Sequence, residues 1–486
     1  MSIRRISNVF SGKSLAASLA LLFLACAALC DDQSQTTAKA KAKATSKISA
    51  PTAKKTSGAA STSKGSGPTT ASHGPTTSPT GRAAITTSRP PAKPAPTPSG
   101  KTSRTTLRTE NGGSVTKRSN GQVATLRDPK RGMQVHHTLS GSRRVEVERA
   151  DHSRIVAERN GRGYVQKPYT YRGHEYAQRS YYYNGRYHQA YYGRYQYHGV
   201  WVNPYYPTYY YPPAYYSWVS YPWGAPAPYA WGWNVNPWYG YYGAFFTPFA
   251  VYPSASFWLT DYIIANSLAA AYQAQAAAIS NPAPLTPDVK QLIADEVRQQ
   301  LSLEYHEAQT DAKNGEPDAA TSSIQQLLND GKRHVFVAGH DLDVVDAGGA
   351  ECALSEGDAI QLTGQTAPDA QAATLAVLAS KSGNECAKGD TVSVALQDLQ
   401  DMQNHMRETI DQGLQELRTK QGHGGLPAAP AAANTPPVET PMAAIAPPPP
   451  PESEVAAQIQ EQSQEADKAE KEAGTDAASA PRPNAP

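Results

Sequence analysis

The stretch Trp223–Phe249 reads WGAPAPYAWGWNVNPWYGYYGAFFTPF and contains no charged side chain. All seven tryptophans of the 486-residue chain, and 27 of its 28 tyrosines, lie between Tyr164 and Tyr272. The prolines from Pro204 to Pro253 are too frequent for a long helix or a central strand. Because rings are the main apolar side chains here, we expect them to pack on one another and on proline in a compact irregular core.

So many rings cannot all be interior, and exposed aromatic patches usually mark contact sites. The sequence therefore also predicts an aromatic binding surface, which we assign to Trp218, Trp223, Trp231, Trp233, Trp238, Tyr239, Tyr241 and Tyr242. Aromatic side chains stack on sugar faces as well as on one another. These rings could form a packed core or a platform for a ligand, and the sequence favours the packed core.

Charge divides the chain into three parts. From 31 to 200 there are 29 Lys and Arg against 9 Asp and Glu. From 201 to 272 the only charged residue is Asp261, and from 273 to 486 there are 13 Lys and Arg against 32 Asp and Glu. Such asymmetry can bring the two ends of the chain together, or attract the basic end to anionic surfaces.

The first thirty residues have the pattern of an export signal peptide. Arg4, Arg5 and Lys13 precede the apolar run LAASLALLFLACAALC at 15–30, which is shorter than the roughly 20 residues of a membrane span. ACA at 25–27 fits ordinary cleavage by a signal peptidase, whereas FLAC resembles a bacterial lipobox and makes Cys26 a candidate lipidation site. We expect an exported protein of the periplasm or cell envelope, with membrane contact only through such an anchor or through electrostatic attraction.

Removing the leader leaves Cys352 and Cys386 as the mature cysteines. Two cysteines in an oxidising compartment favour one disulfide bond. Closing its 34-residue loop stabilises the fold by roughly 3–4 kcal/mol on the chain-entropy model.

Composition and periodicity separate the N-terminal half into two regions. Residues 31–108 are rich in Ser, Thr, Ala, Lys and Pro, which predicts a disordered stalk. In the basic region 109–200, turn signals such as Asn120–Gly121 and Asn160–Gly161 recur between runs that alternate as strands do. These patterns predict a β-hairpin meander with its arginines on the solvent face, followed by the aromatic segment, residues 201–253.

The C-terminal half contains helices and a second β region. Residues 254–310 predict two helices, the second with Thr286 as its N-cap. Five short strand-like runs and a closing helix over 330–420 predict a small SH3-like barrel. Residues 421–486 predict a disordered Pro/Ala-rich acidic tail, with at most a short transient helix at 453–473. The predicted fold class is mainly β with a few helices, or α+β, with disordered arms at both ends.

Several segments resemble a group of uncharacterised secreted bacterial proteins with a Tyr/Trp/Gly/Pro-rich centre and a small C-terminal SH3-like β domain. The segments are FWLTDY at 257–262, LTPDVKQ at 285–291, NECAKGDTVSV at 384–394 and MQNHM at 402–406. The resemblance covers roughly residues 110–420. It implies no established activity.

No motif predicts catalysis, a metal site or a cofactor. The histidines have no spacing typical of metal ligands, and no GxSxG, GxGxxG or GxxxxGK[ST] pattern occurs in a strand–turn–helix setting. The Arg/Tyr-rich hairpins have the composition of a nucleic-acid surface. The export signal and the alternating arginines argue against nucleic acid as a partner.

The leading hypothesis is an exported, non-enzymatic structural or interaction protein of a bacterial cell envelope, with the aromatic segment as its packing and adhesion centre. Its partners would be envelope polymers (peptidoglycan or acidic polysaccharide), envelope proteins or a second copy of the chain. The alternative is a peptidoglycan- or polysaccharide-binding module accessory to a wall hydrolase. An unrecognised hydrolase is the least favoured hypothesis.

Overall fold

The computed structural model describes residues 104–109, 112–183, 186–274, 282–381 and 386–479. The predicted leader, Cys26 and nearly all of the predicted stalk lie outside these residues. The described chain has a mixed α+β fold, which confirms the coarse fold class. Among its helices, none is both long and apolar enough to cross a membrane.

A ten-stranded antiparallel sheet, which we call the meander, forms the N-terminal part. Its strands follow one another in chain order, with β12 added beside β9. They are β1 (Thr105–Arg108), β2 (Ser114–Lys117), β3 (Val123–Asp128), β4 (Met133–His137), β5 (Arg143–Glu148), β6 (Arg154–Glu158), β7 (Gly163–Tyr171), β8 (His174–Tyr183), β9 (Arg186–Gly193) and β12 (Tyr205–Tyr206). At the predicted Asn160–Gly161 turn, within the short 3-10 helix η1 (Arg159–Gly161), both residues have positive φ, at 59° and 73°. The predicted hairpin meander is confirmed.

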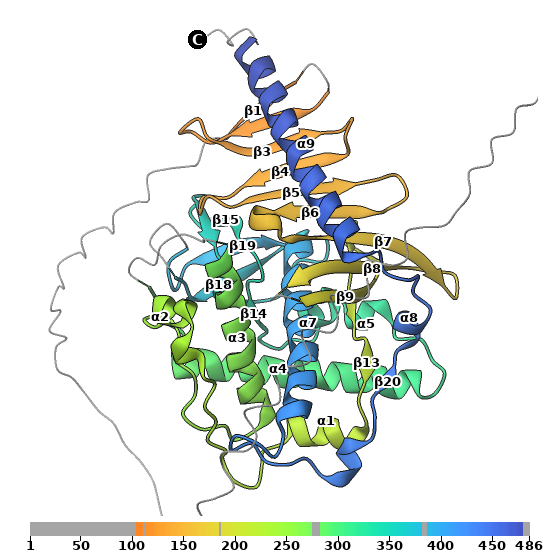
Figure 1. Cartoon of the computed structure of the whole chain (residues 1–486). Helices are drawn as coiled ribbons and strands as arrows, with labels where there is room; N and C mark the ends of the chain where they lie inside the picture. The colour runs from red at the N-terminus through yellow and green to blue at the C-terminus, as the bar shows by residue number, and fades with distance from the viewer. Residues whose placement is uncertain (1–103, 110–111, 184–185, 275–281, 382–385, 480–486) are drawn as a thin grey trace, which may run out of the picture. The chain divides into compact units, whose positions relative to one another are not determined.

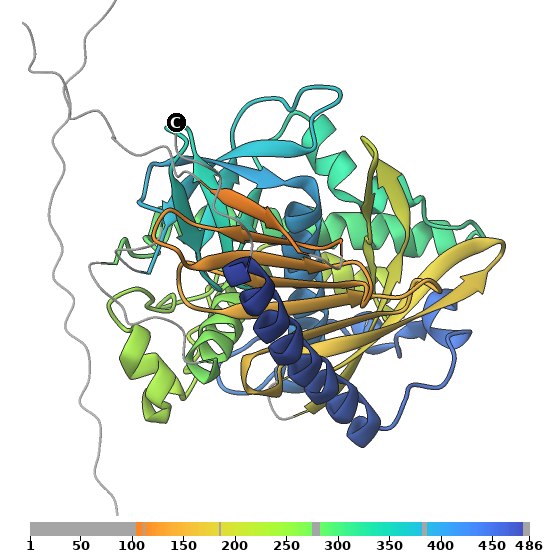
Figure 2. The same ribbon diagram turned by 90° about the horizontal axis from the view of Figure 1, so that it is seen from above.

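A long C-terminal helix, α9 (Glu452–Ser479), covers one face of the meander. Figures 1 and 2 show it running across the strands. Val455, Ile459 and three alanines of α9 are buried against the sheet. The sheet contributes Val115, Leu126, Met133, Val135, Val145, Val147, Ile155, Ala157 and Val165 to this core.

The expectation of a disordered tail therefore fails for the described residues beyond 420. Before α9 the chain forms η3 (Ala431–Asn434), β20 (Val438–Glu439) and α8 (Pro441–Ala444), and it buries Leu426 and Met442. Strand β20 pairs with β13 (Tyr209–Tyr210) of the aromatic segment. The tail has too few large apolar side chains to form a core by itself. One face of the meander is apolar, and the tail folds by packing its apolar side chains on that face.

Ion pairs connect α9 to the basic strands. Arg131 lies 3.0 Å from Glu472, and Arg143 lies 2.9 Å from Asp467. His137 Nε2 is 2.6 Å from Glu470 Oε1. Basic residues of the meander and acidic residues of α9 therefore meet within the fold, which agrees with one of the two sequence-based alternatives for the charge asymmetry.

The arginines of the meander differ from the prediction of a solvent face. Arg118, Arg154 and Arg179 are 5%, 8% and 7% exposed. Arg118 pairs with Asp343 of the C-terminal sheet, and Arg162 lies 2.9 Å from Glu356. Period-two alternation identifies the polar face of a strand, but it does not show whether water or an acidic neighbour covers that face.

Helices and rings form the centre of the molecule. The helices are α1 (Pro213–Ser220), η2 (Trp233–Val235), α2 (Pro237–Tyr242), α3 (Ala255–Gln273), α4 (Pro287–Asp311) and α7 (Leu396–Lys420). The largest buried core joins aromatic side chains from 211 to 258 with the apolar faces of α3, α4 and α7. The Thr286 hydroxyl accepts from the Val289 amide, and Pro287 occupies the first turn of α4, so the predicted N-cap is confirmed.

The second β region is an open six-stranded sheet rather than the predicted SH3-like barrel. Its order is β14-β17-β18-β19-β15-β16, and the described residues contain no pairing between the two edge strands. The strands are β14 (Val335–Val337), β15 (Leu342–Asp346), β16 (Glu351–Leu354), β17 (Ala359–Leu362), β18 (Ala372–Ala379) and β19 (Thr391–Ala395). Helix α7 and the short helices α5 (Ala319–Ser322) and α6 (Ile324–Asn329) lie nearby, and α6, α7 and the hairpin β10 (Tyr195–Tyr197)–β11 (Val200–Val202) contribute to its apolar core. The core is completed by helices, so the sheet does not need to close on itself.

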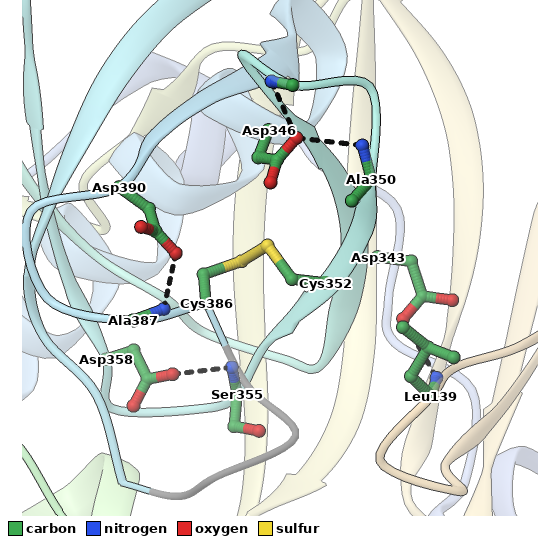
Figure 3. The surroundings of a disulfide bond; sticks show 11 residues. Leu139, Asp343, Asp346, Ala350, Cys352, Ser355, Asp358, Cys386, Ala387 and Asp390 are labelled. Atoms are coloured by element: carbon green, nitrogen blue, oxygen red, sulfur yellow. Dashed lines mark hydrogen bonds between the residues drawn. A yellow bond between two sulfur atoms is a disulfide. The ribbon is translucent and has the colours of Figure 1, made fainter. Parts of the chain in front are cut away.

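The structure joins Cys352 of β16 to Cys386, with a Cα–Cα distance of 5.0 Å (Figure 3). We expect mass spectrometry without reductant to find the two cysteines in one linked peptide. Replacing both by serine should lower the free energy of unfolding by roughly 3–4 kcal/mol, because the unfolded chain is released from a 34-residue loop. Two free thiols in the protein purified from its native host would contradict the bond.

Candidate functional site

The residues of the predicted aromatic surface lie mostly inside the central core. Trp223, Trp238 and Tyr242 are buried. Trp218, Trp231, Trp233 and Tyr239 are half-buried, and Tyr241 is 40% exposed. Packing is therefore the main role of these rings. Ligand binding by the part that reaches the surface stays a prediction.

The ring packing has Trp231 at its centre. Its ring stacks on Trp233 and Trp258, with centroids 4.2 and 4.5 Å away. Its indole N–H donates to the Tyr252 hydroxyl at 2.6 Å, and this hydroxyl donates to Asp261 Oδ2 at 2.8 Å. A carboxylate thus fixes the orientation of the stack.

Asp261, the only charged residue of the chain from 201 to 272, is fully buried and paired with Lys290 of α4. The Lys290 ammonium lies 3.1 Å from Asp261 Oδ1, donates to the Thr247 carbonyl oxygen, and sits 3.6 Å from the Phe249 ring centroid. Burial raises the pKa of Asp261 and lowers the pKa of Lys290, and their mutual attraction opposes both shifts. The pair connects α3, which contains the FWLTDY segment, to α4, which contains most of the LTPDVKQ segment. Its role is to hold these two helices together.

A different region has the features of a binding site. A cavity of about 440 Å³ lies between the β8–β9 hairpin, β12 and one face of α7. Tyr181 and His188, opposite each other on β8 and β9, stack with ring centroids 5.5 Å apart on its wall. The α7 side is polar and is contributed by Glu408, Asp411, Gln412, Gln415, Glu416 and Thr419. We call this the tyrosine–carboxylate cavity.

Tyrosine hydroxyls hold the two inner carboxylates in place. Tyr192 and Tyr181 both donate to Glu408, the latter at 3.1 Å. Tyr205 donates to Asp411 Oδ2 at 2.9 Å, whereas the buried Oδ1 atom has no hydrogen-bond partner among the described residues. Burial raises the pKa of Asp411 to about 6, and burial also raises the pKa of Glu408.

This arrangement suits a ligand with hydroxyl groups. A buried acceptor without a donor costs about 1–3 kcal/mol. Asp411 Oδ1 is shielded from solvent, so a ligand O–H group would recover that cost once the neighbouring side chains shift to admit it. The Tyr181 and His188 rings line the same cavity as these acceptors, and the α7 glutamines can both donate and accept. A pyranose ring has the matching combination of an apolar face and a hydroxyl-bearing edge.

Our sequence interpretation missed this cavity because it considered only the apolar positions of the closing helix. Asp411, Gln412, Gln415 and Thr419 follow Glu408 by three, four, seven and eleven residues. This spacing places them on one helical face, so a continuous polar stripe was present in the sequence. Tyr181, Tyr192 and Tyr205, which bond these carboxylates, lie more than 200 residues earlier in the chain than their partners on α7. No regular spacing in the sequence therefore relates them to α7.

The histidines are distributed over several environments. His405 of α7 places its Nε2 atom 2.9 Å from Ser267 Oγ of α3, and burial lowers its pKa to about 4. Over the residues that the structure describes, no three His, Cys, Asp or Glu side chains are grouped so that they could hold a metal ion.

Comparison with known proteins gives no relative: no family model, curated protein or solved structure matches the chain.

Proposed function

We propose that the protein is an exported, non-enzymatic component of a bacterial cell envelope that binds a saccharide chain, from peptidoglycan or an envelope polysaccharide, in the tyrosine–carboxylate cavity. The observation that carries the proposal is the unpaired Asp411 Oδ1 beside the stacked Tyr181–His188 pair. A sugar hydroxyl would donate to this oxygen while the face of the same ring covers the aromatic pair.

Binding is better supported than hydrolysis. Glu408 and Asp411 are three residues apart on α7 and project from one face of that helix. Glycoside hydrolysis generally requires two carboxyl groups that flank the scissile bond. Carboxylates on a single wall instead accept hydrogen bonds from one edge of a sugar.

The envelope location is supported by the predicted leader and by the pairing of the two mature cysteines. In this proposal the aromatic segment is chiefly a packing centre that positions α3 against α7. Its exposed rings, among them Tyr221 at 68% and Tyr241 at 40% exposure, would provide adhesion to envelope proteins or to a second copy.

The test is calorimetric titration of the oxidised protein with chitotetraose and with purified muropeptides. We expect at least one probe to bind, and we expect Asp411→Asn and Gln415→Ala each to weaken binding about tenfold or more, equivalent to about 1.4 kcal/mol. Gln464→Ala on the exposed side of α9 is the matched control and should bind as the wild type does.

Absence of binding to both probes, or equal binding by Asp411→Asn, would exclude the cavity as a saccharide site. Tryptophan quenching that follows protein concentration and not sugar concentration would favour the self-association hypothesis instead.

A further inference from the structure

A second, longer groove runs along α4. Asp295, Arg298, Ser302, His306 and Thr310 form one wall, at spacings of three and four residues. At 1.5 Å per residue this wall is about 22 Å long. Residues from the α5–α6 segment, including Thr321 and Gln326, form the opposite wall, and the enclosed volume is about 730 Å³. We call it the α4 groove.

Two glutamine side chains in the lining of this groove have unused acceptors. Gln300 is 3% exposed, and its Nε2 donates to Glu296 Oε1 at 2.6 Å. The Gln300 Oε1 and Gln299 Oε1 atoms are both buried without a hydrogen-bond donor among the described residues. Both oxygens are shielded from solvent, so an N–H or O–H group of a ligand in the groove would reach them once the two side chains turn toward it, which would remove the free-energy cost of the unpaired state.

Most charged groups of the groove have an ionic partner in the protein. Glu307 pairs with the buried Arg407, and Asp318, which has no ion pair among the described residues, accepts from the Ala320 amide. Arg298 pairs with Asp295, and Lys332 lies 3.2 Å from Asp330. His334 lies 2.9 Å from both Glu296 and Asp330. The groove therefore presents hydrogen-bonding groups and little unpaired charge, which favours an uncharged ligand.

The chemistry of the walls distinguishes an amide chain from a sugar chain. None of the described residues that line the groove carries a phenyl, phenol or indole ring, in contrast with the tyrosine–carboxylate cavity. Saccharide sites use ring faces for stacking, whereas an extended peptide needs acceptors for its regularly spaced N–H groups. At about 3.3 Å per residue, a groove of this length holds roughly six or seven extended residues.

We propose that the α4 groove binds an extended, uncharged peptide segment, whose backbone N–H groups donate to the Gln299 and Gln300 side-chain oxygens. The hydroxyl and amide groups of Ser302, Thr321 and Gln326 bind the remaining polar backbone atoms. The inference is independent of the saccharide cavity, since the two sites share no lining residue.

The experiment selects phage-displayed random heptapeptides on the full oxidised protein and measures binding of the enriched synthetic peptides by fluorescence anisotropy. We expect uncharged sequences to be enriched, and Ser302→Trp, which fills the middle of the groove, to weaken their binding at least tenfold. Gln464→Trp on the exposed face of α9 introduces the same side chain elsewhere and should leave binding unchanged.

A change in the ligand tests the hydrogen bonds without altering the protein. Methylating the backbone nitrogens of an enriched peptide one at a time should weaken binding at least tenfold at one or two positions and little at the others. No enrichment above an uncoated control would overturn the proposal, as would peptides that bind Ser302→Trp as tightly as the wild type. Displacement of the peptides by chitotetraose would also overturn it, because the site would then accept a saccharide.

Discussion

Replacing Asp261 by alanine is expected to lower the free energy of unfolding by about 3–5 kcal/mol, because it leaves the buried Lys290 ammonium without its counter-charge. Lys290 is 3% exposed and would retain the Thr247 carbonyl oxygen as its nearby acceptor. The substitution also removes the acceptor of the Tyr252 hydroxyl and of the Phe249 amide, the latter at 2.6 Å.

Guanidinium unfolding followed by tryptophan fluorescence measures this loss close to its origin, because Trp231 donates to the same Tyr252 hydroxyl. Asp369→Ala removes an aspartate from an exposed loop and should change stability by less than about 0.5 kcal/mol. The double variant Asp261→Ala/Lys290→Met should cost less than the sum of the two single variants, since no charge is left uncompensated. Equal effects of Asp261→Ala and Asp369→Ala would show that the buried pair does not hold the aromatic core.

The role of the aromatic segment as the packing centre could be predicted from the sequence, because it depends on the composition of that one stretch. A stretch with rings and almost no other large apolar side chains can be cohesive only through those rings, and the structure buries Trp223, Trp238 and Tyr242 accordingly. The Thr286 cap and the Asn160–Gly161 turn were predictable for the same reason, since a few neighbouring residues determine each of them.

Features that depend on distant partners were not predictable in this way. The alternation of Val145 and Val147 showed that the meander has an apolar face but could not show that α9 covers it. Arg118 was on the polar face, as expected, yet Asp343 covers it. The tyrosine–carboxylate cavity requires tyrosines from the hairpins and a polar stripe from α7, which only the tertiary fold brings together.

Removing helix α9, which covers the apolar face of the meander, is the second change for which we expect a large loss of stability. Ending the chain after Pro451 removes α9 and exposes the apolar side chains of β2 to β7, including Val135 and Ile155, which are 0% and 1% exposed in the intact protein. Burial of a valine or isoleucine side chain contributes about 1.5–3 kcal/mol, so the loss is on the order of 5–10 kcal/mol for this part of the fold. We expect the truncated protein to bind a hydrophobic dye and to lose hydrogen-exchange protection in β3–β6, while the six-stranded sheet keeps its protection.

Two point substitutions in the full-length chain test whether the effect of the truncation comes from the lost packing of α9 or from shortening the chain. Ile459→Asp places a charge in the buried face of α9, where Ile459 is 3% exposed, and should reproduce the loss of protection in β3–β6. Gln460→Asp adds the same charge at the neighbouring exposed position and should not. A synthetic peptide of residues 452–479 added to the truncated protein should restore protection by docking on the same face. Full protection of β3–β6 in the truncated protein would mean that the meander is stable with an open apolar face, and that α9 is an accessory to the fold rather than its missing layer.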